Sequence, residues 1–184
     1  MKIIGFCGLP GSGKTTAIEA ISDLGKVITM GDVIRNELLK RNIEPSDDNL
    51  GEMAKKLRNE GGEEIIAEKC VELIEKCGQS DVIFIDGIRS KAEVKVFKKR
   101  WKFPLIAIEL NQKLRYQRII DRARVDDSRD LIDIKERDLR EIGFGLEDVI
   151  KNSDFHIYNE GSIEELKEKT RSIVLKILNS LFDY

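Results

Sequence analysis

The feature of this sequence that most constrains its fold is a glycine-rich segment close to the first residue. The segment fits the pattern G-x-x-x-x-G-K-[ST] at every fixed position, and its residues are Gly8, Leu9, Pro10, Gly11, Ser12, Gly13, Lys14 and Thr15. An apolar run, Lys2–Cys7, precedes it, and apolar residues recur at helical spacing after it. A chance glycine-rich turn lacks this order of strand, loop and helix, so the pattern predicts a phosphate-binding loop (P-loop).

The residue types in the loop suit the binding of a nucleoside triphosphate. Glycines let the backbone curl so that successive N–H groups point at phosphate oxygens. Lys14 supplies a positive charge, and the Thr15 hydroxyl is a ligand that Mg²⁺ accepts in such loops. Thr16 completes the predicted nucleotide-binding residues. We therefore expect the loop to bind ATP together with Mg²⁺.

Composition narrows the possible partners. A chain of 184 residues is long enough for a substantial core, and we expect residues 1–184 to form a single domain. A net charge of −2, from 32 basic and 34 acidic residues, gives no overall attraction to nucleic acid or to an anionic membrane. Any basic function must therefore be local. The sequence has neither an apolar run of transmembrane length nor a signal-peptide pattern, so we expect a cytoplasmic protein, and its oligomeric state stays open.

Short apolar runs alternate with helical patterns along the chain, which is typical of an α/β fold with helices on both faces of a parallel sheet. We expect a three-layer P-loop NTPase fold with a five-stranded parallel sheet. The predicted strands are Lys2–Cys7, Val27–Met30, Val82–Asp86, Leu105–Leu110 and Phe155–Tyr158.

Two connections between these strands are longer than one crossover helix needs. Residues from about 36 to 79 are predicted to form a helical insert, and residues from about 118 to 142 a short lid rich in arginine. Both would leave the carboxyl ends of the strands facing the P-loop, where ligands bind in open α/β sheets.

The third predicted strand ends in a carboxylate, Asp86. A carboxylate at the end of an apolar strand is the usual companion of a P-loop, where it holds Mg²⁺ or its water ligands. Because Gly87 follows, Asp86 is also compatible with a simple turn. The presence of the P-loop favours the metal role, with Thr15 and Asp86 as the metal-binding pair.

Two arginines follow neighbouring predicted strands. Arg35 comes after the second strand, with Asp32 close by, and Arg89 comes after the third. The carboxyl ends of parallel strands converge, and a guanidinium matches phosphate geometry in a bidentate way. Each arginine alone is equally compatible with an exposed helix position, but their parallel placement favours a site for an anionic acceptor.

Arginines also recur after the fourth strand. Arg115, Arg118 and Arg122 are spaced i, i+3 and i+7, so a helix would place them in one stripe, with Arg124 close behind. A solvated face is the alternative, but arginines at this place could close over a triphosphate, so we interpret them as a clamp with Arg118 and Arg122 as candidate catalytic residues. Further charges that we interpret as lid ion pairs, without individual roles, are Asp126, Asp127, Arg129, Arg137 and Asp138.

The last predicted strand is followed by Asn159-Glu160-Gly161-Ser162. This segment could pass under an adenine ring and offer backbone hydrogen bonds, or it could be a plain turn between a strand and a helix. The sequence favours neither reading.

Over nearly its whole length the chain resembles the nucleoside monophosphate kinase family of P-loop proteins. Pro10-Gly11 occurs in the adenylate kinase version of the loop, and Gly31-Asp32-Val33-Ile34-Arg35 resembles that family's G-D-x-x-R segment, whose arginine binds the phosphate of the acceptor. Asp86-Gly87-Ile88-Arg89 resembles its D-G-x-P-R segment, but it lacks the proline and is one residue shorter. The lid is compact, without the long insert or the zinc cysteines of some adenylate kinases.

The segment 154–162 is as similar to dephospho-coenzyme A kinases, which share the fold. In those kinases an aspartate after the second strand acts as a base toward a ribose hydroxyl, and Asp32 matches it. The chain as a whole is most similar to an archaeal group of adenylate-kinase-related proteins that lies between these two families.

The resemblance implies a P-loop kinase-like domain that transfers the γ-phosphoryl group of ATP to a nucleotide or nucleotide-like small molecule held by Arg35 and Arg89. Lys14, Arg118 and Arg122 would stabilise the transferring group. Asp32 would act as a base only for a hydroxyl acceptor, as in dephospho-coenzyme A kinases, because a phosphate acceptor is already nucleophilic. A different class remains open, namely a switch or assembly factor that hydrolyses ATP only when a macromolecular partner is bound.

Overall fold

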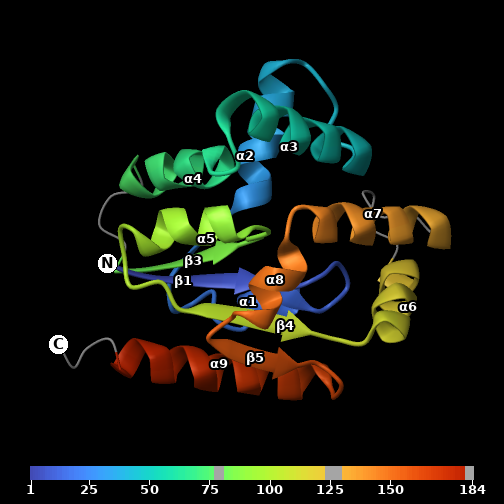
Figure 1. The fold of residues 1–184 in the computed structure, drawn as a ribbon. Coiled ribbons are helices and arrows are strands. Elements are labelled where there is room, and N and C mark those ends of the chain that lie inside the picture. Colours follow the sequence, from blue (N-terminus) through green and yellow to red (C-terminus); the bar gives the residue numbers. More distant parts are fainter. Residues whose placement is uncertain (77–80, 123–129, 181–184) are drawn as a thin grey trace.

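The computed structural model describes residues 1–76, 81–122 and 130–180 (Figure 1). Five parallel strands form one sheet in the order β2-β3-β1-β4-β5. The strands are β1 (Lys2–Cys7), β2 (Lys26–Thr29), β3 (Val82–Asp86), β4 (Leu105–Glu109) and β5 (Phe155–Tyr158). The predicted α/β fold with a five-stranded parallel sheet is confirmed. The second strand ends one residue earlier than expected because Met30 already begins a helix.

Helices cover both faces of the sheet (Figure 1). Their bounds are α1 (Lys14–Glu19), α2 (Met30–Lys40), α3 (Asp47–Gly61), α4 (Ile65–Lys76), α5 (Lys91–Lys98), α6 (Gln112–Arg122), α7 (Leu131–Gly143), α8 (Leu146–Lys151) and α9 (Ile163–Ser180). In the part of the chain that the structure describes, none of these helices has the length and apolar character needed to cross a membrane.

The central strands supply side chains to two separate cores because successive residues point to opposite faces. In β1, Ile3 and Cys7 belong to the core under α2–α5 and α8, whereas Ile4 and Phe6 belong to the core against α1 and α9. Since both faces of β1, β3 and β4 are covered, these strands are continuous apolar runs, whereas β5 at the edge alternates and packs on the second core alone. This double burial fixes the sheet and therefore the position of the loops at its carboxyl end.

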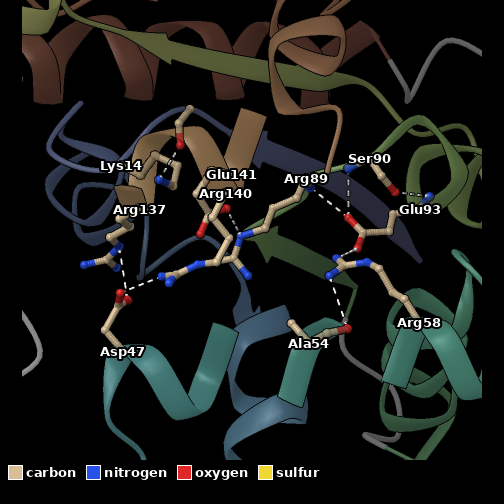
Figure 2. A network of polar contacts seen from close by, with 11 residues as sticks. Lys14, Asp47, Ala54, Arg58, Arg89, Ser90, Glu93, Arg137, Arg140 and Glu141 are labelled. Carbon is tan, nitrogen blue, oxygen red and sulfur yellow. Dashed lines mark hydrogen bonds and ion pairs between the residues drawn. The ribbon is translucent and has the colours of Figure 1, made fainter. Parts of the chain in front are cut away.

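The helices α2, α3 and α4 connect β2 with β3 above one face of the sheet (Figure 1). A buried ion pair anchors them, because Arg58 Nη2 of α3 lies 2.7 Å from Glu93 Oε1 of α5. The second carboxylate oxygen of Glu93 accepts the backbone N–H groups of Arg89 at 2.7 Å and Ser90 at 3.1 Å. The Arg58 guanidinium also lies 4.2 Å from the centre of the Phe144 ring. One carboxylate thus joins the insert to the loop that carries Arg89 (Figure 2).

The helices α6 and α7 lie beyond the carboxyl ends of the strands, at the same end of the molecule as the P-loop (Figure 1). The helix α7 begins after Asp130, whose side chain accepts a hydrogen bond from the Ile132 N–H at 2.8 Å. The N-terminus lies at the opposite end of the sheet. The insert and the lid region therefore approach the P-loop from two directions.

Candidate functional site

A cavity of about 730 Å³ lies at the carboxyl ends of the strands. The P-loop, the segment after β3 and the helices α2, α3, α6 and α7 all contribute to its wall. Its charged and hydroxyl-bearing lining includes Ser12, Lys14, Thr15, Thr16, Arg35, Asp47, Asp86, Arg89, Arg118, Asp121, Arg137, Arg140 and Glu141. Most of the residues singled out in the sequence thus share one space.

The P-loop backbone follows a path that only glycine allows at two points. At Gly13 φ is +103°, and a Cβ atom there would lie 2.3 Å from Asn159 Nδ2. At Gly8 φ is +147°, and a Cβ atom would lie 2.4 Å from the Ile108 carbonyl oxygen. Both substitutions would therefore combine backbone strain with a collision. The close approach leaves the loop concave toward the cavity.

Lys14 extends across the mouth of this loop. Its Nζ donates to the Gly8 carbonyl oxygen at 2.7 Å (Figure 2). Burial lowers the pKa of Lys14, and the Asp86 carboxylate is the group that most opposes this shift. An ammonium whose partner is a neutral carbonyl is strongly stabilised when an anion binds beside it, because desolvated charges interact with little screening. Lys14 is thus poised to meet a phosphate group.

Two buried polar atoms beside the loop lack hydrogen-bond partners within the described ranges. They are Ser12 Oγ and Asp86 Oδ1. An unsatisfied buried polar group costs about 1–3 kcal/mol, so a native structure that keeps one needs a reason such as a missing ligand or ion. Asp86 and Thr15 line the same cavity, and carboxylate and hydroxyl oxygens are ligands that Mg²⁺ prefers. The residues present therefore fit a magnesium ion held between them and a bound phosphate.

That magnesium site would be completed by ligands from outside the chain. Among the described residues, no group of three or more His, Cys, Asp or Glu side chains is arranged to hold a metal ion. Mg²⁺ commonly binds with one or two protein ligands, water and substrate phosphates. The arrangement therefore suits an ion that arrives with the nucleotide.

The two residues predicted after β2 lie on α2, where the Arg35 guanidinium forms an ion pair with the Asp32 carboxylate. Both side chains are exposed. Arg35 lines the cavity, whereas Asp32 is absent from the described residues that line it. In this arrangement Asp32 orients Arg35 instead of facing the cavity.

Arg89 lies in the segment after β3 and forms an ion pair with Glu141 of α7 (Figure 2). Burial lowers the pKa of Arg89, but the carboxylates of Glu141, Glu93 and Asp86 outweigh it and the net pKa is raised. Arg89 lines the cavity as predicted, and its charge is matched by a carboxylate from the lid region. An anionic acceptor at Arg89 would have to compete with Glu141.

A second carboxylate joins the insert to the lid region. Asp47, the first residue of α3, lies 2.5 Å from Arg140 Nη2 and 3.3 Å from Arg137 Nε of α7. Figure 2 shows Asp47 between these two guanidinium groups. Gly51 leaves room for the Arg140 guanidinium, which lies 2.9 Å from the place that a Cβ atom would take. The cavity is thus closed on one side by an ion-pair bridge between α3 and α7.

The arginines of the predicted stripe lie in different environments. The Arg115 guanidinium is buried, where it binds Asp138 through both nitrogens at 3.0 and 2.5 Å and donates to the Pro10 carbonyl oxygen at 2.9 Å. Arg118 lines the cavity, and its Nη2 lies 3.4 Å from the Asn159 carbonyl oxygen. The side chain of Arg122 lies outside the described part of the structure, as do Arg124, Asp126, Asp127 and Arg129. Arg115 supports the loop, and Arg118 faces the cavity.

The segment after β5 contacts the P-loop directly. Asn159 is buried, and its Nδ2 donates to the Ser12 carbonyl oxygen at 2.8 Å. Its own N–H donates to the Glu109 carbonyl oxygen at 2.7 Å, which continues the pairing of β4 with β5. At the start of α9 the Glu165 N–H donates to Ser162 Oγ at 3.1 Å, so the segment between β5 and α9 is a strand-to-helix turn. The side chain that opens this turn holds the P-loop in place.

Sequence reasoning named Arg137 as part of a lid ion pair but missed the rest of the cavity-facing side of α7. The side chains on this side are Arg137, Arg140 and Glu141, followed by Phe144 just after the helix, and all of them line the cavity. Their spacing of i, i+3, i+4 and i+7 was visible in the sequence and marks one helix face. From the sequence, a face with three charges and one aromatic ring looks like a solvated surface. Only the position of α7 opposite α3 shows that this face lines the cavity.

Comparison with known proteins agrees with this arrangement. A family model described as an AAA domain matches residues 4–140. UPF0200 proteins from Methanothermobacter thermautotrophicus and Methanocaldococcus jannaschii are 42% and 39% identical to the chain, over 96% and 100% of its length and 91% and 94% of theirs. The chain belongs to the UPF0200 family of AAA-domain proteins. A UPF0200/UPF0201 protein from Archaeoglobus fulgidus is 43% identical over 98% of the chain, which spans 57% of that longer relative.

Solved structures with the same fold include kinases. The protein TT1252 from Thermus thermophilus has a TM-score of 0.59 at 18% identity, covering 95% of this chain and 97% of that one. A sugar kinase from Janibacter has a TM-score of 0.57 at 14% identity, covering 94% and 93%. Shikimate kinase from Aquifex aeolicus has a TM-score of 0.50 at 14% identity, covering 99% of each chain. At these identities the likeness concerns the fold alone.

Proposed function

We propose that the chain is an ATP-dependent phosphotransferase that moves the γ-phosphoryl group of ATP to a nucleotide-like small molecule. The observation that carries the proposal is the sharing of one cavity by a P-loop lysine, a partnerless strand-end carboxylate oxygen and arginines from both the β2 side and the lid side. Phosphoryl transfer requires positioning and charge stabilisation more than covalent chemistry. A cavity with these groups on opposite walls offers both.

The donor half is formed by the P-loop. Lys14 would move from the Gly8 carbonyl to the β- and γ-phosphates, and the loop N–H groups would bind the phosphate oxygens. Arg118 would contact the transferring group from α6. Thr15 and Asp86 would hold Mg²⁺, which supplies charge neutralisation on the phosphates when bound.

The acceptor half is formed by Arg35, Arg89, Arg137 and Arg140. Of the two acceptor chemistries, the geometry favours an acceptor phosphate over a ribose hydroxyl. A hydroxyl acceptor benefits from a base, but the Asp32 carboxylate is bound to Arg35 and does not line the cavity. A phosphate acceptor needs cations, which this wall provides.

The test is a transfer assay with radiolabelled ATP and Mg²⁺ against a panel of nucleoside monophosphates, other phosphorylated small molecules and dephospho-coenzyme A. We expect ADP and one phosphorylated acceptor in equal amounts, with no transfer after chelation of the metal. Release of inorganic phosphate without transfer to any acceptor, stimulated by a protein partner, would instead support the ATPase switch. Transfer to dephospho-coenzyme A would instead support Asp32 as the base that accepts the proton of the ribose hydroxyl.

A further inference from the structure

A second cavity, of about 780 Å³, lies at the other end of the sheet from the P-loop. The segment that borders it runs from the end of α5 to the start of β4. β4 begins at Leu105, which pairs with Gly5 in parallel β1, so the residues before Leu105 lie toward the amino ends of the strands. The P-loop follows the opposite end of β1. The two cavities are therefore separate sites.

This second cavity has an apolar floor and a basic rim. The apolar lining, here called the floor, comprises Trp101, Phe103, Pro104, Phe155 and Ile177, and the basic lining, here called the rim, comprises Lys98, Lys99, Arg100 and Lys102. Phe103 is buried and stacks on Phe97 with 4.8 Å between the ring centres, so the floor is a fixed part of the core. Trp101 is only half-buried. Four of the five residues 98–102 are basic in a chain whose net charge is −2.

Three charged side chains of the rim are not neutralised locally. Lys98, Lys99 and Arg100 are exposed, and within the described residues their side chains have no ion-pair or hydrogen-bond partner. Asp154 is the one acidic residue among the described lining, and its Oδ2 accepts the Leu105 N–H at 2.8 Å. Basic residues often follow a helix because they interact with its negative end, which accounts for Lys98 in the last turn of α5. Arg100 lies beyond that helix, so the helix end does not account for its charge.

We propose that this cavity binds a nucleotide unit, that is, an aromatic base joined to a phosphate, supplied either as a free nucleotide or within a single strand of nucleic acid. A base would stack on the half-buried Trp101 ring, and its phosphate would contact the Lys98, Lys99 and Arg100 side chains. Sites for single strands combine these two elements, namely aromatic platforms and cations that follow the backbone. The inference is independent of the proposed phosphoryl transfer.

Trp101 gives a direct test because it is the only tryptophan in the chain and lies in the cavity floor. Its fluorescence would be titrated with AMP and with a short single-stranded oligoadenylate. The rim variant is Lys98→Gln/Lys99→Gln/Arg100→Gln. The matched control, Lys113→Gln/Lys135→Gln/Lys167→Gln, removes the same charge from exposed lysines of α6, α7 and α9. All three proteins keep Trp101.

We expect a saturable fluorescence change in the wild type and in the control, and an affinity at least about tenfold lower in the rim variant. For three phosphate contacts on a single strand, the logarithm of the affinity should fall against the logarithm of salt concentration with a slope of about −2. Oligoadenylate that binds at least about tenfold more tightly than AMP identifies a strand as the ligand, and equal affinities identify a free nucleotide. The proposal is overturned if neither probe changes the fluorescence, or if the rim variant and the control bind equally.

Discussion

Arg115 forms a buried bidentate ion pair with Asp138, at 3.0 and 2.5 Å, across the interface of α6 and α7. The same guanidinium donates to the Pro10 carbonyl oxygen of the P-loop at 2.9 Å. On the other side of this contact, a Cβ atom on Gly11 would lie 2.7 Å from the Arg115 carbonyl oxygen. One arginine therefore connects the P-loop to both α6 and α7.

Loss of this ion pair should destabilise the whole domain. Asp138→Ala leaves a buried guanidinium without its counter-charge, so the free energy of unfolding should fall by about 3–5 kcal/mol in urea denaturation. The control is Asp23→Ala, which removes a bidentate but exposed partner of Arg171 and should change stability far less. Equal losses of unfolding free energy in the two variants would mean that burial does not increase the contribution of the Arg115–Asp138 pair to stability.

The bridge between the insert and the lid region should depend on Asp47. Asp47→Asn weakens the contacts to Arg137 and Arg140, so amide hydrogens of α7 should exchange faster with solvent. Asp48→Asn is the control because Asp48 is the neighbouring exposed acid on α3. Hydrogen exchange followed by mass spectrometry measures the effect. Unchanged exchange of α7 in Asp47→Asn would show that the bridge does not hold the helix.

Arg35 should act on the acceptor and not on ATP. Arg35→Ala removes a charge-assisted contact of about 1.5–3 kcal/mol, so the KM for the acceptor should rise by tens-fold while ATP affinity stays nearly intact. Arg41→Ala, at the exposed end of the same helix, is the matched control. Steady-state kinetics with each substrate varied in turn separates the two effects. An equal loss of ATP affinity would place Arg35 in the donor site.

The buried thiols should make stability depend on alkaline pH. Burial raises the pKa of the Cys70 thiol to about 12 from its ordinary value of 9.0, and that of the Cys7 thiol to about 11. The folded state thus holds the thiol protons more tightly than the unfolded state, so this stabilisation is complete below pH 9 and is lost as the pH rises toward 11–12. Between pH 8 and 10.5, urea unfolding of the wild type should lose more stability than that of Cys70→Ala. Equal losses of stability in the wild type and in Cys70→Ala would contradict this prediction.

Much of the sheet could be predicted from the sequence because its central strands are buried on both faces. β1 and β3 have the predicted bounds, since an apolar run between polar residues marks a strand when both faces are covered. The edge strand β5 also has the predicted bounds, although only one of its faces is buried. The P-loop, Asp86, Arg35 and Arg89 could be placed near one another because the carboxyl ends of parallel strands converge. Chain order and strand direction alone carry this information.

The partners of the arginines could not be predicted in the same way. Arg115 and Arg118 are three residues apart on one helix, yet one is buried against Asp138 and the other faces the cavity. The difference depends on how α7 crosses α6, which a helical pattern does not encode. The contact between Asp47 and Arg140 joins residues separated by 93 positions, and the Arg140 guanidinium packs close to Gly51. Such contacts follow from tertiary packing and not from local spacing.

The strand order also determines when the P-loop can take its shape as the chain is made. β1 pairs with β3 and β4, and β2 pairs only with β3, so neither of the first two strands has a partner until residues 82–86 are available. Helices of the insert form from local contacts and can appear earlier, whereas pairing between distant strands is slow because a long loop must close. The P-loop precedes these partners in the chain and is therefore held in its binding conformation late, when β4 and the turn at Asn159 have reached it.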